Sequence, residues 1–382
     1  MSHLDRAKKG ELDMVSKADT SSQKRIKKLS RRAQIRLRKT CLMPQRTHVP
    51  TRMEIRAVVN ALPIMVRVYK LDRSYVTLPV NTHTTIDVLT KMMSLVCKCA
   101  DGNMYGIYEY DSDGERKFLA PKTRVMDVVS DWQKEAEDED SKDAIRKGDH
   151  SAFFMFEIHY FLEDVPEDDV VGNHMLYIQA HDNVRTMKYP LSRKGCLDLG
   201  AIQLQEEFGD YKESKHKSVI QLSLHRYLPP NLIDDPSDYD ECAENILSRW
   251  QKLAGLNFEA FDCQLTYLDL LKPSIWYGCQ RFRVKSIAGS GEYPSGGVWL
   301  NISSRHILVV DCDSNDILET ILMSNIMAFG SKDTTLLFKV GNIVYQEKKC
   351  FITDVRGGAD EITDLIRTYQ RQSRRAMETD SK

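Results

Sequence analysis

The sequence predicts an α+β protein of several domains: a mixed α/β roll, then a helical bundle, then a seven-stranded barrel closed by a C-terminal helix. Three observations lead to this class. From residue 62, apolar and polar residues alternate in a hairpin that leads into an amphipathic helix. Residues 175–271 are largely helical in pattern. From about residue 276 the period becomes two, through seven short segments before a last helix.

Length and composition fit two or three ordinary globular domains. The chain has 382 residues, of which 42% are hydrophobic and 29% charged. We find no apolar run long enough to span a bilayer, and the start, MSHLDRAKKGELD, lacks the apolar core of a secretory signal. The nine cysteines are an odd number without paired spacing, which predicts reduced thiols in a cytoplasmic protein. The one close pair, Cys97 and Cys99, lacks the second pair of a zinc site, so we expect no metal and no cofactor.

Charge is distributed unevenly along the chain. Residues 1–62 carry +11 and the remainder −12, and residues 20–53 contain 11 bases and no acid. Such a block favours an anionic partner, either a lipid surface, an acidic protein surface or nucleic acid. We expect residues 1–22 to be disordered and residues 23–61 to form a basic helical segment. Its first helix, residues 24–40, has an apolar stripe of Ile26, Leu29, Ala33 and Leu37.

Two interpretations of this basic helix remain open. The stripe could face the core of an upstream domain, or the helix could be a basic amphipathic segment that meets a membrane or a calmodulin-like partner. Its candidate residues for an anionic partner are Lys24, Arg25, Lys27, Lys28, Arg31 and Arg32. The block has no interleaved aromatic residues on which bases could stack, so we do not expect it to bind nucleic acid.

The first domain is expected over residues 62–135. Residues 63–71 and 75–80 are strands joined by a turn, Thr84 and Thr85 cap a helix that ends near residue 96, and short strands follow at 104–110 and 117–119. This order is typical of a ubiquitin-like roll. We predict a charged linker over residues 136–152.

The second and third domains are expected over residues 153–272 and 273–373, with a short tail at 374–382. The second opens with an extended apolar segment at 153–162. It continues into a helix, LDLGAIQLQEEFGDY, with Gly209 at its C-terminal cap, and is followed by a Leu228-Pro229-Pro230 loop and further helices. The third has predicted strands at 281–287, 298–303, 306–311, 317–322, 326–329, 335–340 and 343–353. A helix over 359–373 follows, as in a pleckstrin-homology or phosphotyrosine-binding barrel.

Together these segments resemble a FERM domain. The markers are LPIMVRVYKLD in the first lobe, the Gly-Asp-Tyr helix with Leu-Pro-Pro in the second, and Tyr277-Gly278, Gly341-Asn342, Thr353 and Tyr369 in the third. The resemblance covers about four-fifths of the chain. It implies a cloverleaf of ubiquitin-like roll, acyl-CoA-binding-protein-like bundle and PH/PTB-like barrel, and a non-catalytic adaptor that joins membrane proteins, lipids or cargo to the cytoskeleton.

The segment before the first lobe narrows the resemblance. Residues 32–64 are similar to the end of a myosin-tail-homology domain, with an Arg-x-x-x-Pro loop at Arg46–Pro50 and a Glu-containing helix at 52–57. This junction is similar to the tails of unconventional myosins and of a plant kinesin. The sequence departs from those tails because most of the myosin-tail-homology domain and the motor are missing. Phe329 also stands where the family often has Trp.

No catalytic motif is convincing. Gly289-Ser290-Gly291 with Gly296-Gly297 fails the spacing of a dinucleotide loop, and neither a Gly-x-Ser-x-Gly elbow nor a His-Glu-x-x-His pair occurs. We therefore expect the chain not to be an enzyme.

Two binding surfaces are expected in the third lobe. A barrel of this type leaves one strand edge open beside its C-terminal helix, and an extended peptide can add to that edge. The predicted groove residues are Asn325, Ile326, Met327, Ala328, Phe329, Leu365 and Tyr369. The competing interpretation is that the apolar ones only seal the barrel. Arg281, Arg283 and Lys285 alternate along one strand, and either meet a phosphoinositide head group or form a solvated face.

The sequence thus favours a cytoskeleton-associated adaptor of the motor-tail type. Its expected partners are cytoplasmic peptide tails or scaffold proteins, with microtubules, actin-associated proteins or anionic phospholipid as further candidates, and its expected location includes the periphery of the plasma membrane. An ezrin-like membrane–actin linker that binds phosphoinositides is the alternative. The regulatory part of a FERM-bearing phosphatase or kinase is a third hypothesis.

Overall fold

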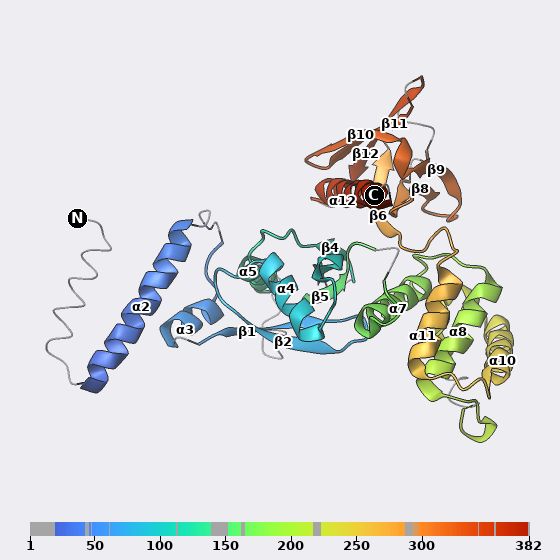
Figure 1. Cartoon of the computed structure of the whole chain (residues 1–382), viewed down its shortest axis with the longest axis horizontal. Coiled ribbons are helices and arrows are strands. Elements are labelled where there is room, and N and C mark those ends of the chain that lie inside the picture. The colour runs from blue at the N-terminus through green and yellow to red at the C-terminus, as the bar shows by residue number, and fades with distance from the viewer. Residues whose placement is uncertain are drawn as a thin grey trace. The chain divides into compact units, whose positions relative to one another are not determined.

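The computed structural model (Figure 1) describes residues 20–42, 46, 48–60, 62–111, 114–138, 152–161, 165–216, 223–286, 293–294, 296–342, 344–354 and 357–380. Contacts divide the chain into two compact units. The first comprises residues 1–66, 79–86 and 122–150, and the second comprises residues 67–78, 87–121 and 151–382. The predicted glycine-rich loop at 289–291 lies outside the described residues.

Within the described residues before the first sheet, the chain forms helices α2 and α3. Helix α2 (Thr20–Leu42) covers the predicted basic helix but begins earlier, so the last three residues of the segment expected to be disordered are helical. Helix α3 (Arg52–Asn60) is closed by a reciprocal cap: the Thr51 amide donates to Glu54 Oε2 at 2.8 Å, and the Glu54 amide donates to Thr51 Oγ1 at 3.1 Å. A Thr-x-x-Glu sequence therefore sets the start of α3.

The first lobe is a five-stranded sheet with helices. Its elements are β1 (Ile64–Tyr69), β2 (Tyr75–Val80), α4 (Ile86–Cys97), β3 (Tyr105–Tyr110), β4 (Arg116–Phe118), α5 (Val125–Asp138) and β5 (Phe153–Ile158). The strand order is β2-β1-β5-β3-β4, with β5 parallel to β1 and antiparallel to β3. Thr85 forms an isolated bridge with Arg124, next to the start of α4.

Two predicted boundaries of this lobe are wrong. The sequence pattern places residues 153–158 in the helical domain, but they form the central strand of the first sheet. Their side chains are almost all buried because a strand between two neighbours is covered on both faces. Residues 125–138 are one helix, so the roll does not end at 135, and the predicted charged linker begins as helix α5.

The second lobe is a helical bundle. It contains α7 (Val170–Arg185), α8 (Arg193–Phe208), α10 (Pro236–Leu253) and α11 (Ala260–Leu271), with short turns η2 (Leu224–Arg226) and η3 (Pro230–Leu232). Gly200 lets α8 and α10 approach closely, because a Cβ there would lie 2.7 Å from Ile246 Cδ1. Buried Trp250 donates Nε1–H to Gln205 Oε1 at 2.9 Å and to the Gly209 carbonyl at 3.0 Å, which ties α10 to the end of α8.

The third lobe is a seven-stranded antiparallel sheet with a C-terminal helix. The strands are β6 (Gln280–Ser286), β7 (Val298–Ile302), β8 (His306–Asp311), β9 (Ile317–Leu322), β10 (Ile326–Lys332), β11 (Thr335–Gly341) and β12 (Gln346–Thr353), in the order β10-β11-β12-β6-β7-β8-β9. Helix α12 (Gly358–Asp380) follows. The predicted tail at 374–382 is wrong for residues 374–380, which continue α12.

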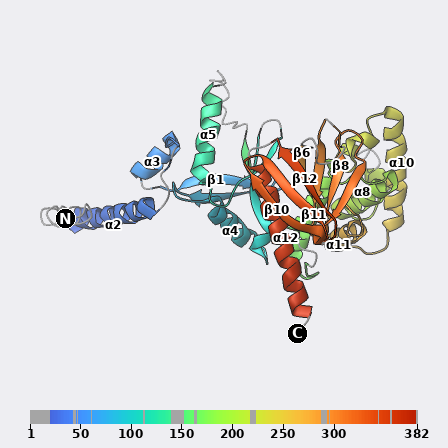
Figure 2. The same cartoon turned by 90° about the horizontal axis from the view of Figure 1, so that it is seen from above.

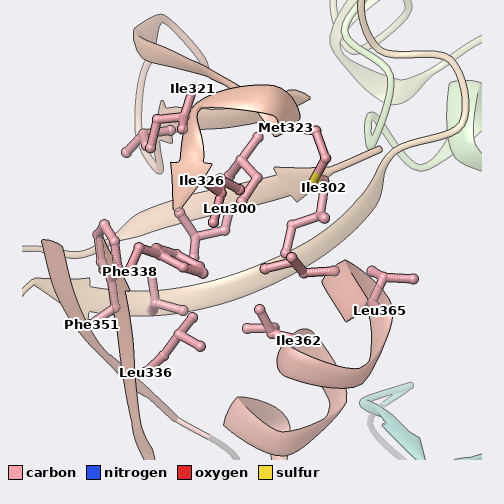
Figure 3. Packing of buried hydrophobic residues seen from close by; sticks show 14 of the residues in the cluster. Leu300, Ile302, Ile321, Met323, Ile326, Leu336, Phe338, Phe351, Ile362 and Leu365 are labelled. Carbon is pink, nitrogen blue, oxygen red and sulfur yellow. The ribbon is translucent and has the colours of Figure 1, made fainter. Parts of the chain in front are cut away.

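The core of this lobe lies between the sheet and α12. Leu300, Phe338 and Phe351 from the strands point toward Ile362 and Leu365 from the helix, and all five side chains are fully buried (Figure 3). The helical spacing of the apolar residues in α12 places one continuous stripe against the sheet. This packing fixes the position of α12 beside β10 and β11 (Figure 2).

Candidate functional site

Strand β10 forms one end of the barrel sheet, with β11 on its inner side. Met327 and Ala328 are exposed, Ile326 is 5% exposed, and Phe329 packs against the core from a half-buried position. A register shift between Ile326 and Ala328 marks an irregularity at the start of the strand. The edge of β10 therefore presents main-chain donors and acceptors beside small or flexible side chains.

Helix α12 is hydrogen-bonded to β10 near both ends of the strand. Ser331 Oγ donates to Asp360 Oδ1 at 2.5 Å, and Gln370 Nε2 donates to the Ile326 carbonyl at 3.2 Å. Ten residues of helix rise about 15 Å and five of strand about 17 Å, so the two pairs are matched in length. The helix is held alongside the strand over the length of the edge. Sequence reasoning missed these polar residues because the members of each pair lie 29 and 44 positions apart.

Three of the predicted groove residues lie elsewhere. Asn325 is exposed but belongs to the short turn η4 (Met323–Asn325), not to the strand. Leu365 is 0% and Tyr369 1% exposed, and the Tyr369 hydroxyl accepts a hydrogen bond from the Phe161 amide at 3.2 Å. Both side chains seal the barrel because they lie on the stripe of α12 that faces the sheet. The helix offers polar residues to the edge instead.

The three bases predicted on one strand do share a face of β6, but they are not equally available. Arg281 stacks over the Trp299 ring at 4.3 Å, donates to the Met187 carbonyl at 2.9 Å and to Asn315 Oδ1 at 2.8 Å, and burial lowers its pKa to about 10. Arg283 and Lys285 are exposed, and their side chains reach the Asp354 carboxylate at 3.7 and 3.2 Å. Arg281 is thus engaged in the fold, which contradicts its predicted role as a free anion ligand.

The basic residues predicted on α2 are exposed: Lys24, Arg25, Lys27, Lys28, Arg31 and Arg32. Part of the apolar stripe is exposed with them, since Leu29 is 50% and Leu37 46% exposed. The bases and the apolar stripe are both accessible in the described part of α2.

The described residues contain no group of three His, Cys, Asp or Glu side chains placed to hold a metal ion. Likewise, none of the helices in the described ranges combines the length and apolar character needed to cross a bilayer. The arrangement in the third lobe is suited to main-chain recognition, because it joins an open strand edge to a polar helix flank.

Family comparisons match three successive parts of the chain. Residues 62–159 match an RA-like domain, residues 164–282 the FERM central domain, and residues 282–373 a PTB domain of the IRS-1 type. The first of these ranges includes β5, in agreement with the sheet.

Curated relatives are distant and much longer. An uncharacterized protein of Drosophila melanogaster is 22% identical over 345 residues, which are 84% of this chain and 18% of that protein. Talin-A of Dictyostelium discoideum is 25% identical over 185 residues, 48% of this chain and 7% of that protein. The chain therefore spans less than a fifth of the length of either relative.

Solved structures have the same fold. The MyTH4-FERM MF1 domain of Dictyostelium discoideum myosin VII aligns with a TM-score of 0.73 and 19% identity, over 95% of this chain and 70% of that one. The C-terminal MyTH4-FERM domain of human myosin 7b, in complex with the harmonin-a PDZ3 domain, aligns with a TM-score of 0.65 and 18% identity, over 91% of this chain and 67% of that one. The FERM domain of Drosophila merlin aligns with a TM-score of 0.62 and 15% identity, over 83% of this chain and 98% of that one. The three matched ranges, in this order, and the aligned structures give the chain the three-lobed fold of a FERM domain.

Proposed function

We propose that this chain is a non-catalytic, cytoskeleton-linked adaptor that captures an extended segment of a cargo or scaffold protein on the edge of β10. The open edge of β10, which is hydrogen-bonded to α12 near both ends of the strand, carries the proposal. The comparisons support this proposal: merlin and myosin tails share the fold, talin is a distant sequence relative, and the myosin 7b domain is in complex with a PDZ domain of harmonin-a. The cytoplasm at the cytoskeleton is the proposed location.

The edge favours an extended peptide over a helical one. A strand added to β10 would pair with its outward main-chain groups, and its side chains would alternate between the helix flank and solvent. Met327 and Ala328 leave room for this addition, and no long charged side chain stands at either position. Affinity would come from main-chain hydrogen bonds and sequence preference from the polar flank, including Asp360 and Gln370.

The test begins with a phage-displayed library of cytoplasmic tail peptides, selected on the purified full chain. We expect Ala328→Asp to weaken an enriched peptide at least tenfold, because it places a charge at the centre of the edge. The matched control is Thr320→Asp, which adds the same charge to an exposed position of β9 at the other end of the sheet. Fluorescence anisotropy of the labelled peptide measures both affinities.

A second measurement distinguishes strand addition from other modes. N-methylation of single peptide amides removes one donor at a time, and we expect losses of about tenfold at every second residue only. A peptide that is insensitive to N-methylation, or that binds Ala328→Asp as tightly as the original chain, would show that the site lies elsewhere.

An anionic partner for α2 is the second part of the proposal. Six exposed bases on consecutive turns, without an acidic neighbour in residues 20–53, support a contact with an acidic surface such as a microtubule or an anionic membrane. Such a contact would place captured cargo at the filament or membrane, and its binding would weaken as salt rises.

A further inference from the structure

The link between β11 and β12 is a hairpin whose described residues are held in place by their own hydrogen bonds. The Asn342 amide donates to the Tyr345 carbonyl at 2.8 Å, and Asn342 Oδ1 accepts from the amides of Val344 and Tyr345, each at 2.9 Å. Gly341 has φ +134°, and a Cβ there would lie 2.1 Å from the Tyr345 carbonyl oxygen. This close approach requires glycine.

The described end of the hairpin directs two apolar side chains into solvent. Val344 is 95% exposed, the highest value among the large hydrophobic side chains of the described residues, and Tyr345 is 65% exposed. Single exposed hydrophobic residues are common on protein surfaces. Here the hydrogen bonds of Asn342 hold two adjacent apolar residues at one point, so they form a single apolar tip. The other exposed apolar side chains in the described part of this lobe are about half as exposed as Val344 or less, such as Met327 at 46% and Leu337 at 45%.

Two lysines stand at the base of the hairpin. Lys339 on β11 lies directly opposite Lys348 on β12, two register steps from the pair Gly341 and Gln346, a separation of about 7 Å. In the described part of the chain, neither ammonium group has an ion-pair partner. Like charges opposite one another in a ladder are unfavourable, and an anion placed between or above them would relieve the repulsion.

The nearest carboxylate on β12 does not neutralise this pair. Glu347 accepts from Lys349 Nζ at 2.8 Å, and Lys349, 3% exposed, also reaches Glu319 at 2.9 Å. Lys349 therefore keeps Glu347 engaged on the side of the sheet away from Lys348. The end of the hairpin is apolar, and its base is positive.

We propose that the β11–β12 hairpin is a membrane wedge, with Val344 and Tyr345 entering the interface of an anionic bilayer and Lys339 and Lys348 lying among the lipid phosphates. Tyr345 and Lys348 are three residues apart, about 10 Å along an extended strand. A tip that enters the headgroup region by about 5–10 Å therefore leaves the lysines near the level of the lipid phosphates. A folded protein partner fits less well, since a stable interface covers about 800 Å² per partner and the tip offers two large side chains. The inference does not depend on peptide capture at β10.

The reporter variant is Tyr345→Trp, mixed with phosphatidylserine–phosphatidylcholine vesicles that contain brominated lipid. Bromine quenches tryptophan only at close range, so we expect quenching in the full chain that carries this substitution. The matched control, Leu95→Trp on α4, is the more accessible of the two positions, at 79% against 65% exposed, and it should show no quenching beyond the unsubstituted chain. Equal quenching in both, or in neither, overturns the wedge.

A second pair of variants separates the two parts of the wedge. Val344→Ser with Tyr345→Ser should lower the vesicle partition coefficient at least tenfold. Lys339→Gln with Lys348→Gln should lower it by about fivefold per lysine on acidic vesicles and leave partitioning to pure phosphatidylcholine unchanged. Circular dichroism and thermal melting of each variant confirm folding. If the serine variant partitions into vesicles as well as the original chain, the proposal is wrong, whether or not the hairpin binds a protein. Peptide binding at β10 should be unchanged in all of these variants.

Discussion

Arg116 forms an ion pair with Glu157 inside the first lobe, with 3.2 Å between Arg116 Nε and Glu157 Oε2. The Glu157 side chain is fully buried, and its Oε1 accepts from the Tyr110 hydroxyl at 2.5 Å. The Arg116 guanidinium lies 3.9 Å from the centre of the Tyr108 ring and donates to Gln280 Oε1 at 3.0 Å. One arginine thus links β4 to β5 and to the first strand of the barrel.

Replacing Arg116 by Met should strongly destabilise the chain. The substitution leaves the Glu157 carboxylate buried without its counter-charge, and breaking a buried pair in this way costs about 3–5 kcal/mol. Urea denaturation followed by circular dichroism gives the free energy of unfolding. Lys117→Met is the control, because Lys117 is more than half exposed and its pair with Glu109 at 3.3 Å should be worth less than about 1 kcal/mol. Similar losses in the free energy of unfolding for the two variants would show that the buried pair of Arg116 and Glu157 stabilises the chain no more than a surface pair.

His159 should make the stability of the chain sensitive to acid. Its ring is 1% exposed, and Nδ1 and the Tyr108 hydroxyl lie 2.5 Å apart in a hydrogen bond. Burial, followed by the positive charge of Arg116, lowers its pKa from 6.5 to about 3. Because the folded state holds the ring neutral, this contribution to stability is complete above pH 6.5 and is lost progressively as the pH falls toward 3.

The corresponding experiment compares pH dependence in the original chain and in His159→Phe. One pH unit changes the free energy of unfolding by up to about 1.4 kcal/mol for one such group, so we expect a loss of about 2 kcal/mol between pH 6.5 and 5. In the His159→Phe variant, the free energy of unfolding should not fall in this pH range because of residue 159. Its stability at pH 7 is lower, because the hydrogen bond to Tyr108 is lost. Identical slopes in both chains would rule out His159 as the cause.

The sequence predicts the helices and strands better than it predicts which of them belong together. The pattern of residues 280–353 predicted all seven barrel strands, because each is a short apolar or alternating run whose signal lies within its own few residues, as in the continuously buried β8 and the alternating β12. The placement of β5 failed for the opposite reason. Its partners in β1 and β3 lie about 85 and 50 positions earlier, and a buried central strand is apolar throughout, so its own residues do not show which sheet they join.

For the candidate site, too, the sequence predicted some residues correctly and missed others. Met327, Ala328 and Phe329 were predicted from an edge position and lie on an edge. Leu365 and Tyr369 were predicted from helical spacing, and that spacing identified the face of α12 that is buried. The residues that do meet the edge, Asp360 and Gln370, lie on polar positions that a pattern search treats as solvated surface.

Gly341→Ala should distort the β11–β12 hairpin. A methyl group at this position would lie far inside contact distance of the Tyr345 carbonyl, at a φ that L-residues rarely adopt, so we expect a loss of about 1–3 kcal/mol in the free energy of unfolding. Gly330→Ala in β10 is the control, because a Cβ there has no neighbour within 4 Å. Thermal melting compares the two variants. A Gly341→Ala chain as stable as the control would show that the turn adopts another conformation.

Reversal of the charges on α2 should weaken contact with acidic surfaces. Changing Lys27, Lys28, Arg31 and Arg32 to Glu alters the helix by eight charge units at exposed positions, and cosedimentation with microtubules and with phosphatidylserine vesicles measures the effect separately. We expect binding to one of these surfaces to fall at least tenfold, and the salt dependence of binding by the original chain to be lost with it. The control reverses four exposed lysines outside α2: Lys98, Lys122, Lys252 and Lys272. Both variants change the total charge by the same amount. An equal loss of binding in the control would therefore show that net charge alone causes the effect. Unchanged sedimentation of the α2 variant would show that this helix is not part of the binding surface.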